Sequence, residues 1–362
     1  MMKRIVLAGL AVLLLAGLGT FIFAQRQIGE FLFSRAVEQR VGVDRSAELP
    51  DGLHVYVCGS GSPMGDAERA GPCLAVLAGR TALVFDAGAG SVRNLGPMGY
   101  PFPQLKAAFL THLHSDHLDS LGELMLQAWI AGGRSEPLPV YGPPGTERVV
   151  AGFVEAYTID RGYRIAHHGP EVANPAGFGA EARVIDLAQL EAADWDGTVF
   201  SNGEVRVTVL RVDHSPVDPA YAYRVEYGGR AVVISGDTSK VAAMAEFAKG
   251  ADVIFHDALN PQMVGQMGAA LAKRDQPRLA KVMADIPDYH ASPLDAAQTA
   301  QEAQVGTLVL YHMVPGPPVA LIEEAFLGGA RDAFEGTLEL AQDGMLVSLP
   351  AGKTDVTFEQ LF

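Results

Sequence analysis

One short segment of the sequence concentrates side chains that bind metal ions. Residues 111–117 read Thr-His-Leu-His-Ser-Asp-His, so three imidazoles and one carboxylate stand close together. Side chains two positions apart on an extended strand point to the same side, so His112 and His114 can bind one ion. The turn that follows would bring Asp116 and His117 towards a second ion. Imidazole and carboxylate ligands suit zinc best, while iron and manganese remain open.

Three further candidate ligands stand elsewhere in the chain. A metal ion usually takes its ligands from several segments, so residues 111–117 need partners. Each candidate comes just after a predicted strand, where the chain passes into a loop: His214, Asp237 and His312. We therefore expect three strand ends to converge on residues 111–117 and to hold two divalent metal ions, most simply Zn²⁺.

The elements that must position these residues are strands mixed with helices along the whole chain. Short apolar runs between Gly-rich turns predict strands, and helical spacing of apolar residues predicts helices. The expected strands are 53–58, 73–78, 81–85, 107–110, 138–141, 205–212, 222–227, 231–234, 253–255, 308–311, 337–340 and 345–349, and the expected helices are 118–129, 241–248 and 294–303. Residues 169–179 favour a long surface loop. This mixture predicts an α+β fold with helices covering the outer faces of sheets.

These segments resemble the metallo-β-lactamase superfamily, and within it the branch of ribonuclease Z and arylsulfatase-like secreted metallohydrolases. Residues 111–117 match the superfamily's hallmark, and Ser-Gly-Asp-Thr at 235–238 matches a further motif. Val-Cys-Gly-Ser-Gly-Ser-Pro at 57–63, Tyr-Gly-Pro at 141–143 and His-Ala-Ser from His290 resemble the ribonuclease Z branch. The likeness runs from about Leu53 to about His312.

The resemblance implies a four-layer αβ/βα sandwich over residues 51–362, with a dinuclear site at one edge. It assigns His112, His114 and His214 to one metal, Asp116, His117 and His312 to the other, and Asp237 to both. Two cations about 3.5–4 Å apart would share a water and supply hydroxide near neutral pH.

The same resemblance suggests catalytic roles. Asp116 would take the proton of the attacking water, and His290 would stabilise developing charge or protonate the leaving group. The alternative for His290 is a loop histidine bonded to a backbone carbonyl. His256 precedes Asp257 where the branch usually has His-Glu, and we expect His256 to orient a ligand rather than to bind metal.

The N-terminus predicts export. Met-Met-Lys-Arg followed by an uncharged run over residues 5–23 is typical of a signal peptide or a membrane anchor spanning residues 1–24. Cleavage after Ala24 and an uncleaved anchor both remain open. Residues 25–50 predict an amphipathic neck, which either lies near the membrane or packs on the domain as a linker helix. We therefore expect a periplasmic protein, or a membrane-anchored one that faces the extracytoplasmic side.

Two cysteines, one polar segment and one further histidine remain to be interpreted. Cys58 and Cys73 leave a disulfide and two buried free thiols open. The polar residues 160–169 could contact an anionic substrate or form a solvated loop, and His54 is interpreted as a strand residue. The sequence does not fix the oligomeric state and leaves a dimer open.

The charge balance bears on the substrate. A net charge of -15 and a pI near 5.0 argue against nucleic acid, whose binding rests on Lys and Arg, and no long Gly/Pro-rich basic arm of the kind that ribonuclease Z uses for tRNA is seen. The first expectation is therefore hydrolysis of a small anionic or ester-type substrate, a phosphodiester or a sulfate ester. The alternatives are a ribonuclease Z-type endoribonuclease and a lactone or β-lactam hydrolase. Seven ligands argue against a non-catalytic binding module.

Overall fold

The computed structural model describes residues 2–187 and 197–362, which form two units. The first unit, Met1–Glu48, contains helix α1 (Met2–Arg40) and the short 3-10 helix η1 (Arg45–Glu48). No helix among the described residues is long and apolar enough to cross a membrane. The anchor or signal expected at residues 1–24 begins at Met1, which lies outside the described residues, and it stays a prediction.

The second unit, Leu49–Phe362, is built on two mixed sheets. In spatial order the first sheet contains β15 (Thr357–Gln360), β14 (Met345–Pro350), β1 (Gly52–Gly59), β2 (Cys73–Ala78), β3 (Thr81–Phe85), β4 (Leu105–Phe109), β5 (Leu138–Gly142) and β6 (Ala180–Val184). The second sheet contains β13 (Thr337–Leu340), β12 (Thr307–Val314), β11 (Val253–Leu259), β10 (Arg230–Ile234), β9 (Val217–Tyr227), β8 (Arg206–His214) and β7 (Thr198–Ser201).

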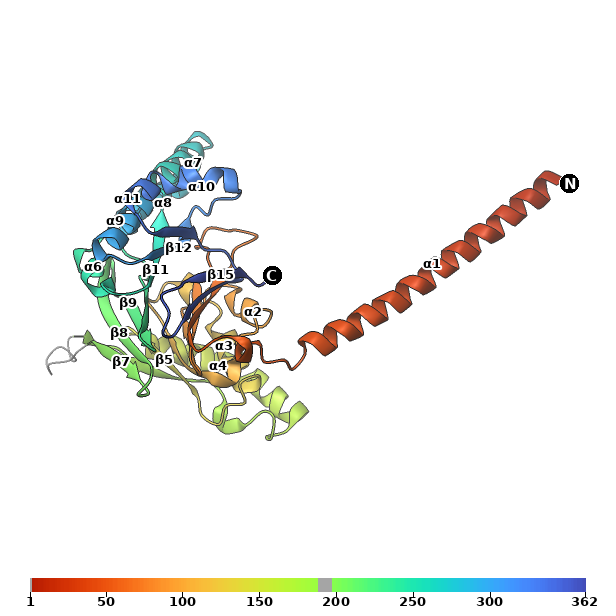
Figure 1. Cartoon of the computed structure of the whole chain (residues 1–362), viewed down its shortest axis with the longest axis horizontal. Helices are drawn as coiled ribbons and strands as arrows, with labels where there is room; N and C mark the ends of the chain where they lie inside the picture. The colour runs from red at the N-terminus through yellow and green to blue at the C-terminus, as the bar shows by residue number, and fades with distance from the viewer. Residues whose placement is uncertain (1, 188–196) are drawn as a thin grey trace. The chain divides into compact units, whose positions relative to one another are not determined.

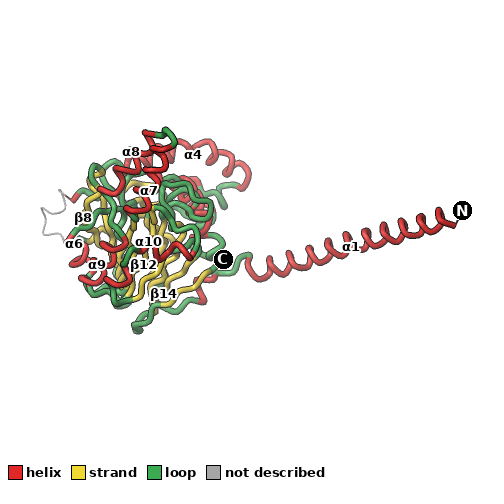
Figure 2. Tube along the Cα trace, turned by 90° about the horizontal axis from the view of Figure 1, so that it is seen from above, coloured by secondary structure: helices red, strands yellow, loops and turns green. Residues whose placement is uncertain are grey.

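Helices cover the outer face of each sheet, as Figures 1 and 2 show. On the first sheet these are α2 (Ser91–Leu95), α3 (Leu121–Ile130) and α4 (Thr146–His168), and on the second α6 (Ala242–Ala248), α9 (Pro293–Ala303), α10 (Ala320–Leu327) and α11 (Ala330–Ala333). Two more helices, α7 (Pro261–Lys273) and α8 (Pro277–Asp285), form a hairpin after β11. The order helix, sheet, sheet, helix confirms the expected four-layer sandwich.

The main core lies between the two sheets. Apolar side chains of both sheets form one buried cluster, in which the rings of Phe85 and Phe109 stack 4.9 Å apart. Central strands such as β1 and β12 are buried along their whole length because each is covered on both faces. This packing fixes the strand ends, and the loops that leave those ends are free to carry a site.

Cys58 at the end of β1 and Cys73 at the start of β2 form a disulfide. The bond decides between the two states that the sequence leaves open. It closes the loop of residues 59–72 at its base, and both sulfur-bearing side chains are fully buried. Residues 160–168, expected in a polar loop or pocket wall, instead belong to helix α4.

Candidate metal centre

The carboxyl ends of four strands bring the seven candidate ligands together. His112 and His114 lie in the loop after β4, and Asp116 and His117 in the 3-10 helix η3 (Ser115–His117). His214 is the last residue of β8, Asp237 follows β10, and His312 lies inside β12, two residues before its end. The side chains of this set approach one another closely enough to hold metal ions. The convergence expected from the sequence is therefore present.

Local backbone conformation orients the side chains of His312 and Asp237. The pairing of β11 with β12 skips one residue at His312, which has a φ of 45°. Such a bulge turns a side chain out of the regular alternation of the strand. Before Asp237, Gly236 has a φ of 60°, and a Cβ atom there would lie 2.6 Å from the Tyr221 carbonyl oxygen. The glycine of Ser-Gly-Asp-Thr is thus required for the turn that presents Asp237.

The first metal group consists of His112, His114 and His214. His112 Nε2 lies 2.9 Å from His114 Nδ1, which lies 3.3 Å from His214 Nε2. The Nδ1 of His214 lies 2.9 Å from the Tyr289 carbonyl oxygen, which can only accept a hydrogen bond. His214 therefore donates through Nδ1, and its Nε2 lone pair faces the other two imidazoles.

The second group consists of Asp116, His117 and His312. Oδ2 of Asp116 lies 3.3 Å from Nε2 of His312 and 3.6 Å from Nε2 of His117. His117 and His312 are buried, and Asp116 is 9% exposed. A carboxylate oxygen and two imidazole nitrogens thus point into one space, as a second metal ion requires.

Asp237 joins the two groups. Its Oδ2 lies 3.2 Å from His117 Nε2, 3.3 Å from His312 Nε2, 3.9 Å from His112 Nε2 and 4.0 Å from His214 Nε2. One carboxylate oxygen faces imidazoles of both groups, which is the position of a bridging ligand.

The donor set fits a pair of cations. Neutral imidazole nitrogens of His112 and His214 lie 2.9 Å and 3.3 Å from Nδ1 of His114, and lone pairs held this close need a shared positive charge. Among the described residues, Oδ1 of Asp237 is buried and has no hydrogen-bond partner. A buried carboxylate oxygen without a partner is costly, and a metal ion would satisfy it.

Asp86 supports the centre and was missed by the sequence reasoning. It follows β3 with a φ of 58°, accepts hydrogen bonds from the backbone N–H and hydroxyl of Thr111, and lies 2.8 Å from Nδ1 of His117. Because a carboxylate only accepts, His117 holds its proton on Nδ1 and leaves Nε2 for a metal. The signal was available, since Asp86 follows an apolar strand just as the ligands do.

His290 lies beside the centre, in the loop before α9, and bonds a carboxylate and not the backbone carbonyl of the alternative. Its Nδ1 lies 3.0 Å from Oδ2 of the buried Asp257, and its ring centroid lies 5.1 Å from that of His214 and 5.5 Å from that of His312. His256 is also buried, with Nδ1 3.1 Å from Oδ1 of Asp257. His256 Nδ1 also lies 2.9 Å from the backbone oxygen of Asp257, so among the residues that the structure describes its polar contacts are with Asp257 and not with a candidate metal ligand, and the orienting role stays a prediction.

Burial and neighbouring charges set the protonation of the ligands. Desolvation holds the pKa of His112 well below its usual range, and the other imidazoles add to this effect. Burial also lowers the pKa values of His114 and His214. For Asp237, burial alone would raise the pKa, but the charges of His312 and His117 hold it well below its usual range. The lowered pKa values of His112, His114 and His214 favour neutral imidazoles, and the lowered pKa of Asp237 favours a carboxylate, which are the forms that bind metal ions. The pKa of His117 is instead raised well above its usual value: burial would lower it, but the carboxylates of Asp237 and Asp86 outweigh that effect.

Comparison with known families decides what this centre belongs to. A family model described as the Beta-lactamase superfamily domain matches residues 81–313, which contain all seven candidate ligands and His290. The chain belongs to the metallo-β-lactamase superfamily. This confirms the resemblance seen in residues 111–117 and in Ser-Gly-Asp-Thr.

Relatives place this metallo-β-lactamase superfamily member in the ribonuclease Z branch. Ribonuclease Z of Mycolicibacterium paratuberculosis is 39% identical over 293 residues, covering 80% of this chain and 96% of that protein. The metallo-β-lactamase fold protein YhfI from Bacillus subtilis matches with a TM-score of 0.58 and 22% identity, over 83% of this chain and 100% of that one. Human tRNase Z, short form, matches with a TM-score of 0.55 and 20% identity, over 82% and 99%. The chain is therefore a metal-dependent hydrolase.

The expectation that nucleic acid is not a partner is wrong. The relatives that this superfamily member matches over most of its length are ribonucleases, and a structural neighbour is a tRNase. The prediction relied on the net charge, which sums over the whole chain. Phosphate groups are contacted by only a few basic side chains on one surface, so a negative net charge does not exclude nucleic acid binding.

Two other groups singled out from the sequence lie outside the centre. Arg164 lies on α4 and pairs with Asp160 through atoms 2.6 Å apart, and His167 and His168 are exposed at the end of that helix. His54 is a buried strand residue, as expected, with Nδ1 2.9 Å from the Ser348 hydroxyl and Nε2 2.7 Å from the Pro50 carbonyl oxygen.

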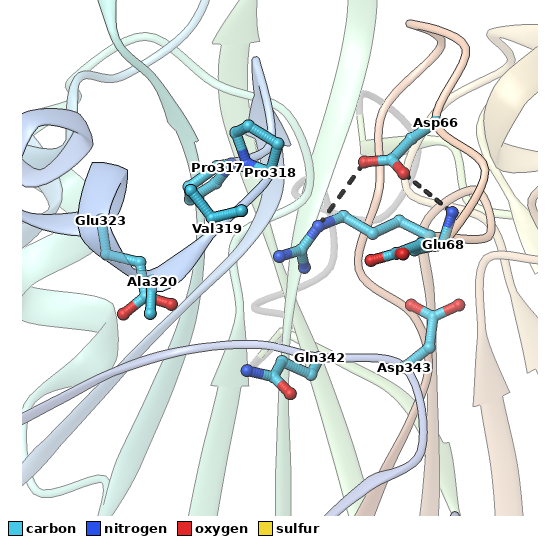
Figure 3. A pocket seen from close by; sticks show the side chains of 10 residues that line it. Asp66, Glu68, Pro317, Pro318, Val319, Ala320, Glu323, Gln342 and Asp343 are labelled. Atoms are coloured by element: carbon cyan, nitrogen blue, oxygen red, sulfur yellow. Dashed lines mark hydrogen bonds and ion pairs between the residues drawn. The ribbon is translucent and has the colours of Figure 1, made fainter.

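A pocket of about 280 Å³ lies between the loop after β1 and the start of α10. Figure 3 shows Asp66, Glu68 and Asp343 on one side of it and Glu323 on the other. The Arg69 guanidinium donates hydrogen bonds to the Ser60 hydroxyl at 3.0 Å and to the Ala341 carbonyl oxygen at 2.8 Å. The charged side chains that line this pocket are acidic except for Arg69, and we call the acidic ones the carboxylate wall. This wall repels phosphate groups.

Proposed function

We propose that this protein is an endoribonuclease of the ribonuclease Z type, which hydrolyses phosphodiester bonds in RNA. One observation carries the proposal: a complete set of seven converging ligands stands in a chain that is 39% identical to a ribonuclease Z and spans 96% of that relative. The match over nearly the full length of the relative favours this substrate over the small phosphodiester or sulfate ester first expected.

The seven candidate ligands would bind two metal ions. His112, His114 and His214 would hold one ion, Asp116, His117 and His312 the other, and Asp237 would contact both. Imidazole and carboxylate donors favour zinc, and we propose Zn²⁺ for both positions. When bound, such a pair supplies a water of lowered pKa and clamps the oxygens of the scissile group.

The protein's own residues would move the protons. Asp116 presents Oδ2 to the shared space at the centre and is placed to accept the proton of the attacking water. His290 faces the same space, and its hydrogen bond to Asp257 raises its pKa despite the opposing effect of burial. A protonated His290 would give its proton to the departing oxygen of the RNA.

The test is cleavage of a precursor tRNA transcript by the purified, zinc-loaded protein, with the products sized on a sequencing gel. We expect cleavage at one position, loss of cleavage after chelation, and no cleavage by His114→Ala. Bis-p-nitrophenyl phosphate, p-nitrophenyl sulfate, a lactone and nitrocefin form the comparison panel. Turnover of the lactone or nitrocefin alone, with the RNA intact, would overturn the proposal.

We also propose that the chain is exported. Support comes from Met-Met-Lys-Arg followed by the uncharged residues 5–23. Cell fractionation tests the location, and mass spectrometry of the purified N-terminus tests cleavage after Ala24. Recovery of the full-length protein in the cytosolic fraction would contradict export.

A further inference from the structure

The helical hairpin of α7 and α8 begins at the same sheet edge as the metal centre. Asn260, the residue after β11, caps α7 through its side-chain oxygen, which accepts from the Met263 N–H, and its amide donates to the carbonyl oxygen of Phe326 at 2.8 Å. The two helices pack closely at Gly268, where a Cβ atom would lie 3.2 Å from the Cβ of Met283. The hairpin is therefore a fixed part of the domain.

The tip of this hairpin is basic. Residues 273–281 contain Lys273, Arg274, Arg278 and Lys281 but only one acidic residue, in a chain whose net charge is -15. All four basic side chains belong to exposed residues. Lys281 pairs with Asp285. Within the described part of the chain, no ion pair is found for the other three basic residues, which we call the tip cations: Lys273, Arg274 and Arg278.

The hairpin links the tip cations to the catalytic residues. α7 has 13 residues, so the tip lies about 20 Å along the helix from Asn260. α8 then returns to the 3-10 helix η6 (Ile286–Asp288), which is followed by Tyr289 and His290. The Tyr289 ring packs 5.1 Å from the ring of His214. The tip is thus anchored at both ends beside the centre and lies one helix length away from those anchor points.

We propose that the tip cations bind the phosphate backbone of the RNA substrate at a distance from the cleaved bond. This inference rests on the ribonuclease function proposed above. Unpaired cations attract a polyanion, whereas the carboxylate wall around Asp66, Glu68 and Glu323 repels one. RNA would therefore be held on the hairpin side, by contacts that position the substrate without reading its sequence.

The placement has a measurable consequence. A substrate that reaches from the centre to the tip must extend along α7, which is about 20 Å long, so a small phosphodiester should be indifferent to the tip. Each phosphate neutralised by a cation contributes about 0.7 to 0.9 to the slope of log affinity against log salt concentration. Three tip contacts should therefore contribute about 2 to 3 to that slope.

The experiment compares wild type with the triple variant Lys273→Ala, Arg274→Ala, Arg278→Ala. We expect kcat/KM for a precursor tRNA transcript to fall at least about tenfold at moderate salt, with the salt slope reduced by about 2 to 3. Hydrolysis of bis-p-nitrophenyl phosphate should be unchanged, which shows that the variant is folded and its centre intact. A second variant that keeps the charges, Lys273→Arg, Arg274→Lys, Arg278→Lys, should retain most of the RNA activity.

A matched control removes the same charge elsewhere. Arg80, Lys106 and Lys353 are exposed and lie at the opposite ends of the strands, away from the metal centre. The variant Arg80→Ala, Lys106→Ala, Lys353→Ala should cleave RNA like wild type. If it loses as much activity as the tip variant, the effect comes from net charge and the proposal fails.

Other outcomes separate the two proposals. If wild type does not cleave RNA at all, the ribonuclease proposal fails and this one falls with it. If wild type and the tip variant cleave RNA equally, only the tip inference is overturned. Leu279 and Val282 are also exposed on α8, so binding to phosphatidylserine vesicles is measured in parallel. Loss of vesicle binding with RNA cleavage unaffected would assign the tip to a membrane and contradict our proposal.

Discussion

Nδ1 of His290 lies 3.0 Å from Oδ2 of Asp257, a carboxylate at the end of β11 that is fully buried. The second oxygen of this carboxylate lies 3.1 Å from Nδ1 of His256. Asp257 thus stands between two imidazoles and fixes the direction of the one that faces the metal centre. Since the carboxylate accepts, His290 holds a proton on Nδ1 and directs its other ring nitrogen away from Asp257.

We predict that Asp257→Asn lowers kcat for RNA cleavage about 10²-fold to 10⁴-fold while the metal content stays near that of wild type. His290→Asn should have an effect of similar size. The double variant should lose little beyond either single change, because both act on one proton transfer. Single-turnover cleavage rates and metal analysis of the three variants provide the test. Additive losses would show that the two residues act independently.

Asp86→Asn should weaken metal binding without removing a ligand. Both oxygens of Asp86 accept hydrogen bonds, one from the Thr111 N–H and the other from the Thr111 hydroxyl and His117 Nδ1. An asparagine has only one accepting oxygen, so it cannot serve both sides, and the imidazole loses its fixed tautomer and direction. We expect the affinity for metal to fall about 10-fold to 100-fold, as is usual when a residue that orients a ligand is lost. Competition with a chromophoric chelator measures this affinity. Unchanged affinity would mean that Thr111 and the packing around it orient His117 alone.

The sequence predicted the metal centre better than it predicted the helices. The seven candidate ligands lie at or near the ends of apolar strands of both sheets, so their convergence could be expected from a local pattern, while their assignment as ligands stays a prediction. The same pattern applies to Asp86, which was overlooked because it stands alone. Helices α4, α7 and α8 were not predicted. They bury few side chains: Thr146 and Val150 on α4, Val264 on α7 and none on α8, so little apolar patterning marks them in the sequence.

The substrate class was harder to predict from the sequence than the positions of the candidate ligands. A net charge cannot show where basic residues gather. The tip cations lie within residues 273–278 of the sequence, but only the fold shows that this segment is the exposed tip of a hairpin that starts beside the metal centre. The disulfide between Cys58 and Cys73 was also open, because pairing depends on β1 and β2 being neighbours in the sheet.

Removing the disulfide should destabilise the fold. Cys58 and Cys73 are 15 residues apart, and closing a loop of this length stabilises a protein by about 3 kcal/mol through the unfolded state. We expect Cys58→Ala, Cys73→Ala to lower the free energy of unfolding in urea by roughly this amount. A reducing agent should destabilise wild type and leave the double variant unaffected. Equal sensitivity of both proteins would contradict the prediction.

His54 should make stability depend on pH. Burial lowers its pKa below the usual value, although its hydrogen bond to the Pro50 carbonyl works in the opposite direction. The unfolded chain therefore takes up a proton more readily than the folded one, so stability falls as pH drops below about 6.5. Between pH of about 7.5 and about 5.5, zinc-saturated His54→Gln should lose less stability than wild type in urea. Identical losses would show that His54 does not contribute.

The convergence of seven side chains on two ions is tested most directly by counting the ions. Protein freed of metal with a chelator is titrated with zinc, and both bound zinc and hydrolysis of bis-p-nitrophenyl phosphate are followed. We predict two zinc ions per chain, with activity that requires the second, and fewer than two in Asp237→Asn. Full activity with one ion or none, or two ions in an unaffected Asp237→Asn variant, would contradict the account.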